Sequence, residues 1–374
     1  MGPAIRFLCL AALALMLPVA TASAQSCKEP PQSVLPGVHE WLRKARASGH
    51  PLAGRVFTGN GLMRPQRADG CRNIDPLFVV AEQAASGRLG EKPSLTGGLT
   101  LLGEVHDNPW HHDLRAEILR RASALKPARA GEESQVPAAV FEHIRTDQQA
   151  ALDLFSELSR KGQHLDRPAE FFRFLKWDQS GWPDKALFQP LFRAAIAGRL
   201  PILPGDPPRD TIRTIAKQGL GATLTGDEVA RLKLDQPLPP LLQDALLSEL
   251  EASHCGLVPK AAFTTMADAQ RYRDAHLADA LLKAAEKYGG AVLLTGNGHV
   301  RSDRGVPYYL RQMAPGRRIL TILLLEVQAG KTDPAAYVQR GPEGRPVADY
   351  VVFTPRVERK DPCIEMRERF KSRN

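Results

Sequence analysis

The sequence predicts an α/β protein with a mixed, largely parallel sheet flanked by helices and interrupted by a helical insertion. Short apolar runs, most of which stop at a glycine or a glutamate, have the length and composition of buried strands. These runs are residues 99–102, 136–141, 200–203, 291–295 and 319–325. Segments with helical periodicity lie between the runs. Strands that alternate with helices are typical of a parallel sheet with crossover helices.

The segments with helical periodicity are of two kinds, namely two long amphipathic stretches and a predicted insertion. Residues 113–125 and 266–288 each repeat apolar side chains every three or four positions, which predicts a buried stripe on a long helix. Residues 210–256 predict the helical insertion, in which Thr225 and Glu228 have the spacing of a capping box. The glycines just before this box do not follow an apolar strand, so they do not indicate a dinucleotide-binding loop.

The chain begins with a segment typical of an export signal. Residues 1–24 combine an arginine, an uncharged apolar run too short to span a bilayer and a small-residue cleavage site. We therefore expect a mature protein that is periplasmic or secreted. Residues 25–97 are rich in proline, glycine and arginine and predict an irregular lead-in, and residues 98–374 predict the α/β domain.

An outer-membrane lipoprotein is the minor alternative for the location. It would require lipid attachment at Cys27, but the residues before this cysteine lack the larger apolar residue of a lipidation site. Nucleic acid is an unexpected partner. The chain has 50 lysines and arginines against 41 aspartates and glutamates, but the basic residues are scattered rather than gathered in one stripe.

The cysteine pattern fits an exported protein. Removal of the signal would leave Cys27, Cys71, Cys255 and Cys363, which are far apart and contain no Cys-x-x-Cys motif. A zinc ribbon and a thioredoxin-type motif are therefore excluded. Three disulfide connectivities are compatible with four cysteines, and we favour Cys27 with Cys71 and Cys255 with Cys363.

Chemically versatile residues gather just after two of the predicted strands. Residues 103–112 read Gly-Glu-Val-His-Asp-Asn-Pro-Trp-His-His, and residues 296–301 read Gly-Asn-Gly-His-Val-Arg. The spacing Gly-x-x-His occurs in both, ending at His106 and His299. Because the carboxyl ends of parallel strands meet at one edge of a sheet, we expect these two imidazoles to face a shared crevice.

Two carboxylates belong to the same expected site. Glu104 precedes His106 by two residues, and Glu142 ends another predicted strand. Carboxylates at the ends of buried strands are costly to desolvate unless they are paired, which favours a polar pocket. A single histidine at a strand end is more often hydrogen-bonded or exposed than functional. We expect that ordinary structural role for His39, His50, His143, His164 and His276.

Together these motifs resemble the ChaN-like haem-binding family, which belongs to a superfamily with Tiki, TraB and erythromycin esterase proteins. The resemblance extends from about residue 99 to about residue 363. It rests on residues 103–108, Phe141-Glu142, His254-Cys255-Gly256, Gln270 with Arg273-Asp274, residues 296–301 and residues 303–307. It implies an exported or outer-membrane-associated protein that binds haem and is linked to iron acquisition. Some relatives in the wider superfamily hydrolyse esters or peptides.

A haem site needs an axial donor, an apolar slot and cations for the two propionates. The candidate haem-binding residues are His106, His111, His112, His254, His299, Arg301, Arg304 and Tyr308. An imidazole or the tyrosine would bind the iron, and the guanidiniums would pair with the propionates. This hypothesis also allows a homodimer.

The same residues allow a second class of function, which is hydrolysis. The catalytic candidates would then be Glu104, His106, Glu142 and His299. His106, His299 and Glu104 would hold a divalent transition metal that acidifies a water, or one imidazole would act as a base without metal while Arg301 stabilises an oxyanion. We favour haem binding and keep a metal-dependent or His/Glu-dependent esterase or peptidase as the alternative.

Overall fold

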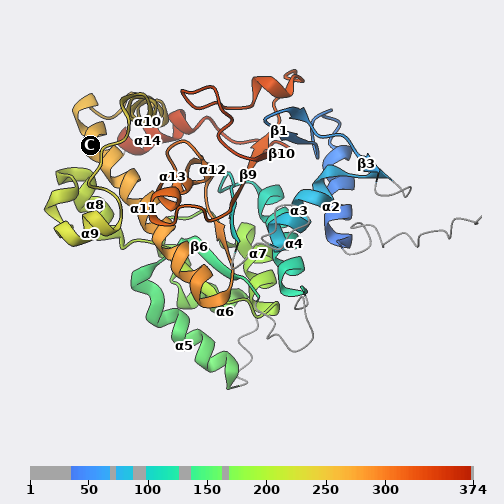
Figure 1. Ribbon diagram of the computed structural model, residues 1–374, viewed down its shortest axis with the longest axis horizontal. Coiled ribbons are helices and arrows are strands. Elements are labelled where there is room, and N and C mark those ends of the chain that lie inside the picture. Colours follow the sequence, from blue (N-terminus) through green and yellow to red (C-terminus); the bar gives the residue numbers. More distant parts are fainter. Residues whose placement is uncertain (1–34, 68–72, 87–97, 126–135, 162–167, 372–374) are drawn as a thin grey trace, which may run out of the picture.

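The fold is organised around a mixed sheet, seen in a computed structural model that describes residues 35–67, 73–86, 98–125, 136–161 and 168–371 (Figure 1). The expected signal segment and the expected Cys27–Cys71 disulfide lie outside these ranges. Among the described helices, none is long and apolar enough to span a bilayer.

The central sheet contains eight of the described strands, in the order β2-β1-β10-β9-β5-β8-β6-β7. They are β1 (Val56–Thr58), β2 (Gly61–Leu62), β5 (Leu99–Leu102), β6 (Ala138–Arg145), β7 (Ile202–Asp206), β8 (Ala291–Leu294), β9 (Ile319–Glu326) and β10 (Tyr350–Thr354). Strands β5 to β10 pair in parallel, and β1 and β2 join antiparallel at one end. Strands β3 (Gln66–Arg67) and β4 (Asn73–Ile74) form a separate pair. The predicted α/β class is confirmed.

Alternation of side chains along the strands divides the core into two layers. Leu102 and Phe141 pack into one layer, and their neighbours Leu101 and Val140 pack into the other. The first layer is covered by α2 (Pro36–Ala47), α3 (Pro76–Ser86), α4 (Pro109–Ser123), α5 (Gln149–Arg160), α6 (Pro168–Phe174) and α7 (Lys185–Ala197). The second layer is covered by α8 (Arg209–Gln218), α11 (Phe263–Tyr288) and α13 (Val306–Met313). In Figure 1 the blue and teal helices α2, α3 and α4 lie to the right of β9, and most of the orange α11 lies to its left.

The segment expected to be an irregular lead-in is regular where the structure describes it. Strand β1 extends the central sheet by pairing with β10, and α2 buries Trp41 and Leu42 in the first layer. The prolines and glycines of this segment mark turns between short elements, a pattern that composition alone does not distinguish from irregular chain. The lead-in therefore belongs to the same core as the rest of the chain.

The stretch between β7 and α11 is helical, as predicted. It contains α8, α9 (Gly226–Arg231) and α10 (Pro240–Ser253). The N–H of Thr225 donates to the Glu228 carboxylate at 2.9 Å, and the N–H of Glu228 donates to the Thr225 hydroxyl at 3.3 Å. This reciprocal pair is the predicted capping box at the start of α9.

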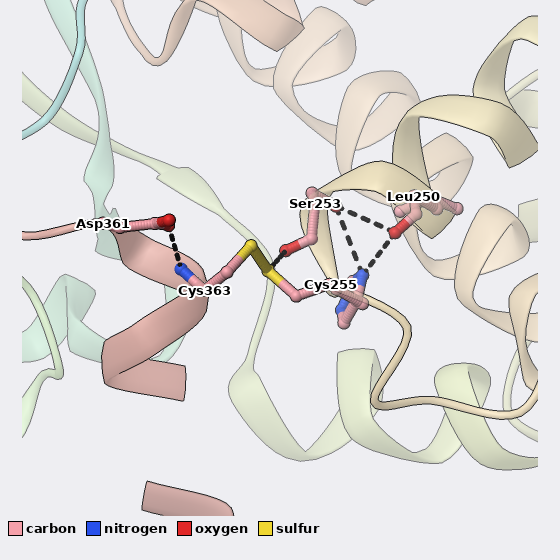
Figure 2. Close-up of a disulfide and its surroundings, with 6 residues drawn as sticks. Leu250, Ser253, Cys255, Asp361 and Cys363 are labelled. Atoms are coloured by element: carbon pink, nitrogen blue, oxygen red, sulfur yellow. Dashed lines mark hydrogen bonds between the residues drawn. A yellow bond between two sulfur atoms is a disulfide. The ribbon is translucent and has the colours of Figure 1, made fainter. Parts of the chain in front are cut away.

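A disulfide joins this insertion to the C-terminal helix α14 (Pro362–Lys371), as Figure 2 shows. Cys255 lies just after α10, and Cys363 lies in the first turn of α14, with the two Cα atoms 5.5 Å apart. The N–H of Cys363 donates to the Asp361 carboxylate at 2.8 Å, which holds the start of the helix. The predicted pairing of Cys255 with Cys363 is confirmed.

Replacing both cysteines by serine (Cys255→Ser with Cys363→Ser) should lower the free energy of unfolding by about 2–4 kcal/mol, because the unfolded chain is no longer constrained by the cross-link. Urea denaturation without reductant measures the change, with wild type under the same conditions as the control. Equal unfolding midpoints for the two proteins would contradict this expectation.

Candidate functional site

Polar side chains from the parallel strands and the loops that follow them meet at the carboxyl edge of the sheet. Together with side chains from helices α4 and α11, those that are buried or half-buried form two groups. The Glu104 cluster consists of Glu104, His106, His112, Arg115 and His143. The Glu142 cluster consists of Glu142, Asp206, Arg273, Asp274 and His299.

In the Glu104 cluster, each carboxylate oxygen of Glu104 lies close to two nitrogen-bearing side chains. Oε1 lies 2.7 Å from Nδ1 of His106 and 2.6 Å from Nε2 of His143. Oε2 forms an ion pair with Arg115 and lies 3.2 Å from Nδ1 of His112. Burial alone would raise the pKa of Glu104, but Arg115, His143 and His112 outweigh it and hold the pKa well below its usual range. Glu104 is therefore a fixed anion.

Helix α4 carries the cation that makes this burial possible. Asn108 caps the helix by accepting the N–H of Trp110 at 2.8 Å, and Pro109 occupies its first turn. This start places Arg115 against Glu104, where the whole residue is inaccessible to solvent. A buried carboxylate without such a partner would be strongly destabilising.

The two adjacent histidines of α4 form hydrogen bonds to other parts of the protein through their ring nitrogens. His111 accepts the N–H of Val105 at Nδ1, at 2.8 Å, and its Nε2 lies 2.7 Å from Oγ1 of Thr354. Nε2 of His112 donates to the carbonyl of His106 at 2.9 Å. Burial lowers the pKa of His111 well below its usual range and that of His112 to about 4, so both rings are neutral at neutral pH. Neither ring has a free nitrogen.

In the Glu142 cluster, one carboxylate binds backbone, hydroxyl and cations. Oε2 of Glu142 accepts the Thr295 hydroxyl and the N–H of Gly296, both at 2.7 Å. Oε1 accepts a hydrogen bond from Arg273 at 2.8 Å and lies 3.3 Å from Nε2 of His299. Strand β6 continues past Glu142, which was expected to end it, and its register with β7 shifts between Phe141 and Arg145. This continuation brings Glu142 and its neighbour His143 to the site.

His299 is held as a cation by two carboxylates. Its Nδ1 donates to Asp274 at 2.7 Å, and its Nε2 faces Glu142. Burial alone would lower the pKa of His299, but the charges of Glu142 and Asp274 raise it to about 10. Both nitrogens therefore carry protons at neutral pH, and neither is available as a donor to a metal.

His106 differs from His299 in having one free nitrogen. Burial lowers the pKa of His106, but the hydrogen bond to Glu104 and the charge of Glu142 raise it overall. Nδ1 is bound to Glu104, whereas Nε2 makes no hydrogen bond with any described residue. The side chain is 36% exposed. Of the imidazoles in the two clusters, His106 is the one that reaches solvent.

The two Gly-x-x-His motifs fit into each other. A methyl group added at Gly296 would lie 3.0 Å from Cε1 and Nε2 of His106. In return, a methyl group at Gly103 would collide with Oδ1 of Asn297. Asn297 uses its side chain to bridge to β9, where its Nδ2 donates to the carbonyl of Leu324 at 2.8 Å. Each glycine therefore makes room for a side chain of the other motif, so the two motifs pack against each other at the carboxyl edge of the sheet.

Three residues of the site were not anticipated. His143, expected to have an ordinary structural role, contributes directly to the Glu104 cluster. Arg115 was signalled only by its position one helical turn after His111 and His112. Trp182 had no signal in the sequence: its ring lies 4.9 Å from that of His106 and 4.7 Å from that of His143, and its Nε1 donates to the carbonyl of His143 at 3.1 Å.

The other candidate haem-binding residues lie elsewhere. Nδ1 of His254 bonds to the carbonyl of Leu250 at 2.7 Å, at the end of α10. The remaining three lie just after α12 (Asn297–Val300) or in α13. Arg301 pairs with Asp303 at 2.7 Å, Arg304 pairs with Asp303 and Glu249, and Tyr308 packs against Tyr309. Within the described chain, no hydrogen bond, ion pair or ring contact links these four to the Glu104 cluster.

The distances between donor atoms in the Glu104 cluster suit a divalent metal, but the charges in the cluster do not favour one. Glu104, His106 and His143 offer donor atoms within 4.8 Å of one another. This group includes His143 in place of the expected His299. Arg115, however, already neutralises Glu104, and a divalent cation would lie close to the guanidinium. The donor distances permit a metal, but the electrostatics do not require one.

These features define an α/β protein with two histidine–carboxylate clusters at the carboxyl edge of its sheet, in which His106 is the accessible imidazole. Residues 96–310 match the family described as haem-binding uptake, Tiki superfamily, ChaN, and the chain belongs to this family. The expected family and fold are thus confirmed.

A solved structure described as "Cofacial heme binding to ChaN of Campylobacter jejuni" is similar in fold. The TM-score is 0.53, with 16% sequence identity, over 79% of this chain and 95% of that chain. No curated protein matches the chain.

Replacing Arg115 by methionine should destabilise the fold by about 3–5 kcal/mol, because Glu104 would be left buried without its cation. Chemical denaturation measures this change. The double variant Glu104→Gln with Arg115→Met should recover part of the loss, since it removes the unpaired charge. Arg120→Met, at an exposed position of the same helix, serves as the control. A similar small effect for both arginines would show that Glu104 does not depend on Arg115.

The raised pKa of His299 predicts a pH dependence of stability. The imidazolium is favoured in the folded state, so its contribution is present in full below about pH 6.5 and is lost as the pH rises to about 10. The difference in unfolding free energy between wild type and His299→Gln should therefore shrink across this range. Asp274→Asn should narrow the range, because it removes one of the two carboxylates. A difference that is constant with pH would contradict the assignment.

Proposed function

We propose that this protein binds haem through His106. The single observation that carries the proposal is that Nε2 of His106 makes no hydrogen bond with any described residue and lies in a partly exposed ring, whereas Nδ1 of His143, which also lacks a partner, is buried. Membership of a family described as haem-binding supports the choice of ligand. The protein whose fold resembles this chain is itself described as binding haem cofacially.

The surroundings of His106 suit an axial ligand of haem iron. Histidines that bind metals usually donate their other ring N–H to a carboxylate or carbonyl, which fixes the tautomer and the ring orientation. Glu104 plays this part at 2.7 Å, and its own position is fixed by Arg115. Gly296 leaves space beside Nε2 that a larger residue would fill. His106 is thus oriented to bind before any ligand arrives.

The proposed function includes export and a part in haem or iron uptake or storage. The signal-like residues 1–24 support export. The Cys255–Cys363 disulfide is also typical of an oxidising compartment such as the periplasm. A homodimer that holds haem between two copies, and association with the outer membrane, remain parts of this hypothesis.

Titration of the purified mature protein with haemin tests the proposal. A Soret band characteristic of histidine-bound haem should appear in wild type and be lost in His106→Ala, whereas His254→Ala should behave like wild type. Gly296→Ala should weaken binding by about tenfold or more, because the added methyl group crowds Nε2. If His106→Ala bound haemin with an unchanged spectrum, His106 would not be the ligand.

Hydrolysis is the second candidate function, and the Glu104–His106 pair is the observation that favours it. A carboxylate that orients an imidazole whose other nitrogen is free is the arrangement of a general base. Elemental analysis for bound metal, together with assays on ester and peptide substrates, tests this alternative. Turnover that is abolished by His106→Ala, in a protein that gives no haemin spectrum, would favour the hydrolase.

A further inference from the structure

Trp182, which lies beside His106, and Arg209, which is hydrogen-bonded to the loop that carries Trp182, have no part in either cluster. Trp182 lies in the loop before α7, and its ring contacts both His106 and His143. Arg209, the first residue of α8, donates to the carbonyl of Ser180, two residues before Trp182. Both side chains belong to half-buried residues. Trp182 places an aromatic ring next to the accessible imidazole, and Arg209 places a guanidinium against the loop that carries this ring.

Trp182 is held in place by the strand that forms the site. Its indole N–H donates to the carbonyl of His143 on β6, and its backbone N–H donates to the Ser180 hydroxyl at 3.1 Å. Trp182 therefore does not depend on His106 for its position. A flat ligand bound at Nε2 of His106 is much wider than an imidazole, so its edge reaches a ring that lies only 4.9 Å away.

Arg209 has a charge that the described protein does not neutralise. No carboxylate of the described residues forms an ion pair with it, and its hydrogen bond goes to a backbone carbonyl. The neighbouring Asp210 pairs instead with Arg213 at 3.6 Å. By contrast, Arg301 and Arg304 already have carboxylate partners. A half-buried guanidinium without an anion is suited to a carboxylate of a ligand.

We propose that Trp182 and Arg209 form a recognition subsite beside His106 that selects a flat ligand with a carboxylate at its edge. Trp182 contacts the face or edge of the ring system, and Arg209 pairs with the carboxylate. This inference rests on the proposed haem binding and assigns the anion-pairing role to Arg209 in place of Arg301 and Arg304.

Haemin and its dimethyl ester separate the two parts of this subsite, because the ester keeps the ring system but lacks the carboxylates. Soret titrations should give wild type a preference for haemin over the ester of about tenfold. Arg209→Gln should remove this preference by weakening haemin alone, whereas Arg213→Gln, one turn along the same helix and exposed, should keep it. Trp182→Leu should weaken both ligands about threefold, and Trp182→Phe should restore most of the affinity.

The outcomes distinguish a failure of the proposed subsite from a failure of the proposed haem binding. Thermal unfolding of each variant checks that it is folded. If wild type binds haemin and His106→Ala does not, but Arg209→Gln keeps the wild-type preference, the subsite is wrong while haem binding stands. The proposed subsite would also be wrong if Trp182→Leu bound both ligands with wild-type affinity. If wild type gives no haemin spectrum at all, the proposed function fails and the subsite fails with it.

Discussion

The burial of a charged carboxylate, Glu104, is the constraint on which the site depends. Residue 104 is 2% exposed at the end of a central strand, where an unpaired charge would be very costly. The protein compensates this charge from several directions: helix α4 supplies Arg115 and His112, strand β6 supplies His143, and the loop after β5 returns His106. These elements must therefore pack correctly before the charge is stable. The orientation of His106 follows from that packing.

The two histidines of the paired motifs have the same spacing from a glycine but different electrostatic surroundings. His299 lies between two carboxylates and is a buried cation, which helps to balance the negative charge of Glu142, Asp206 and Asp274. His106 has a single carboxylate partner that is already paired with Arg115, and its second nitrogen is open. The motif thus specifies where an imidazole lies, and the neighbouring charges determine whether one of its nitrogens is open to a ligand.

The sequence predicted the parallel strands, the two long helices and the meeting of the two Gly-x-x-His motifs because each depends on local periodicity or on where strands end. It did not predict β10, which pairs with β9, or β1, which lies in a segment rich in turns. At the site it identified Glu104, His106, Glu142 and His299 from motif density. His143 and Trp182 were missed, because an isolated histidine or tryptophan gains its meaning only from neighbours that are distant in sequence.

The interlocking of the two glycine motifs has a consequence for how such a site changes over time. Because Gly103 faces Asn297 and Gly296 faces His106, a larger residue at either glycine is tolerated only with a smaller one across from it. The effects of substitutions in these pairs should be strongly non-additive. Sequence variation in one motif is thereby tied to variation in the other, although they are separated by nearly the whole domain. Amino-acid changes at these glycines would therefore have to occur in pairs, one in each motif.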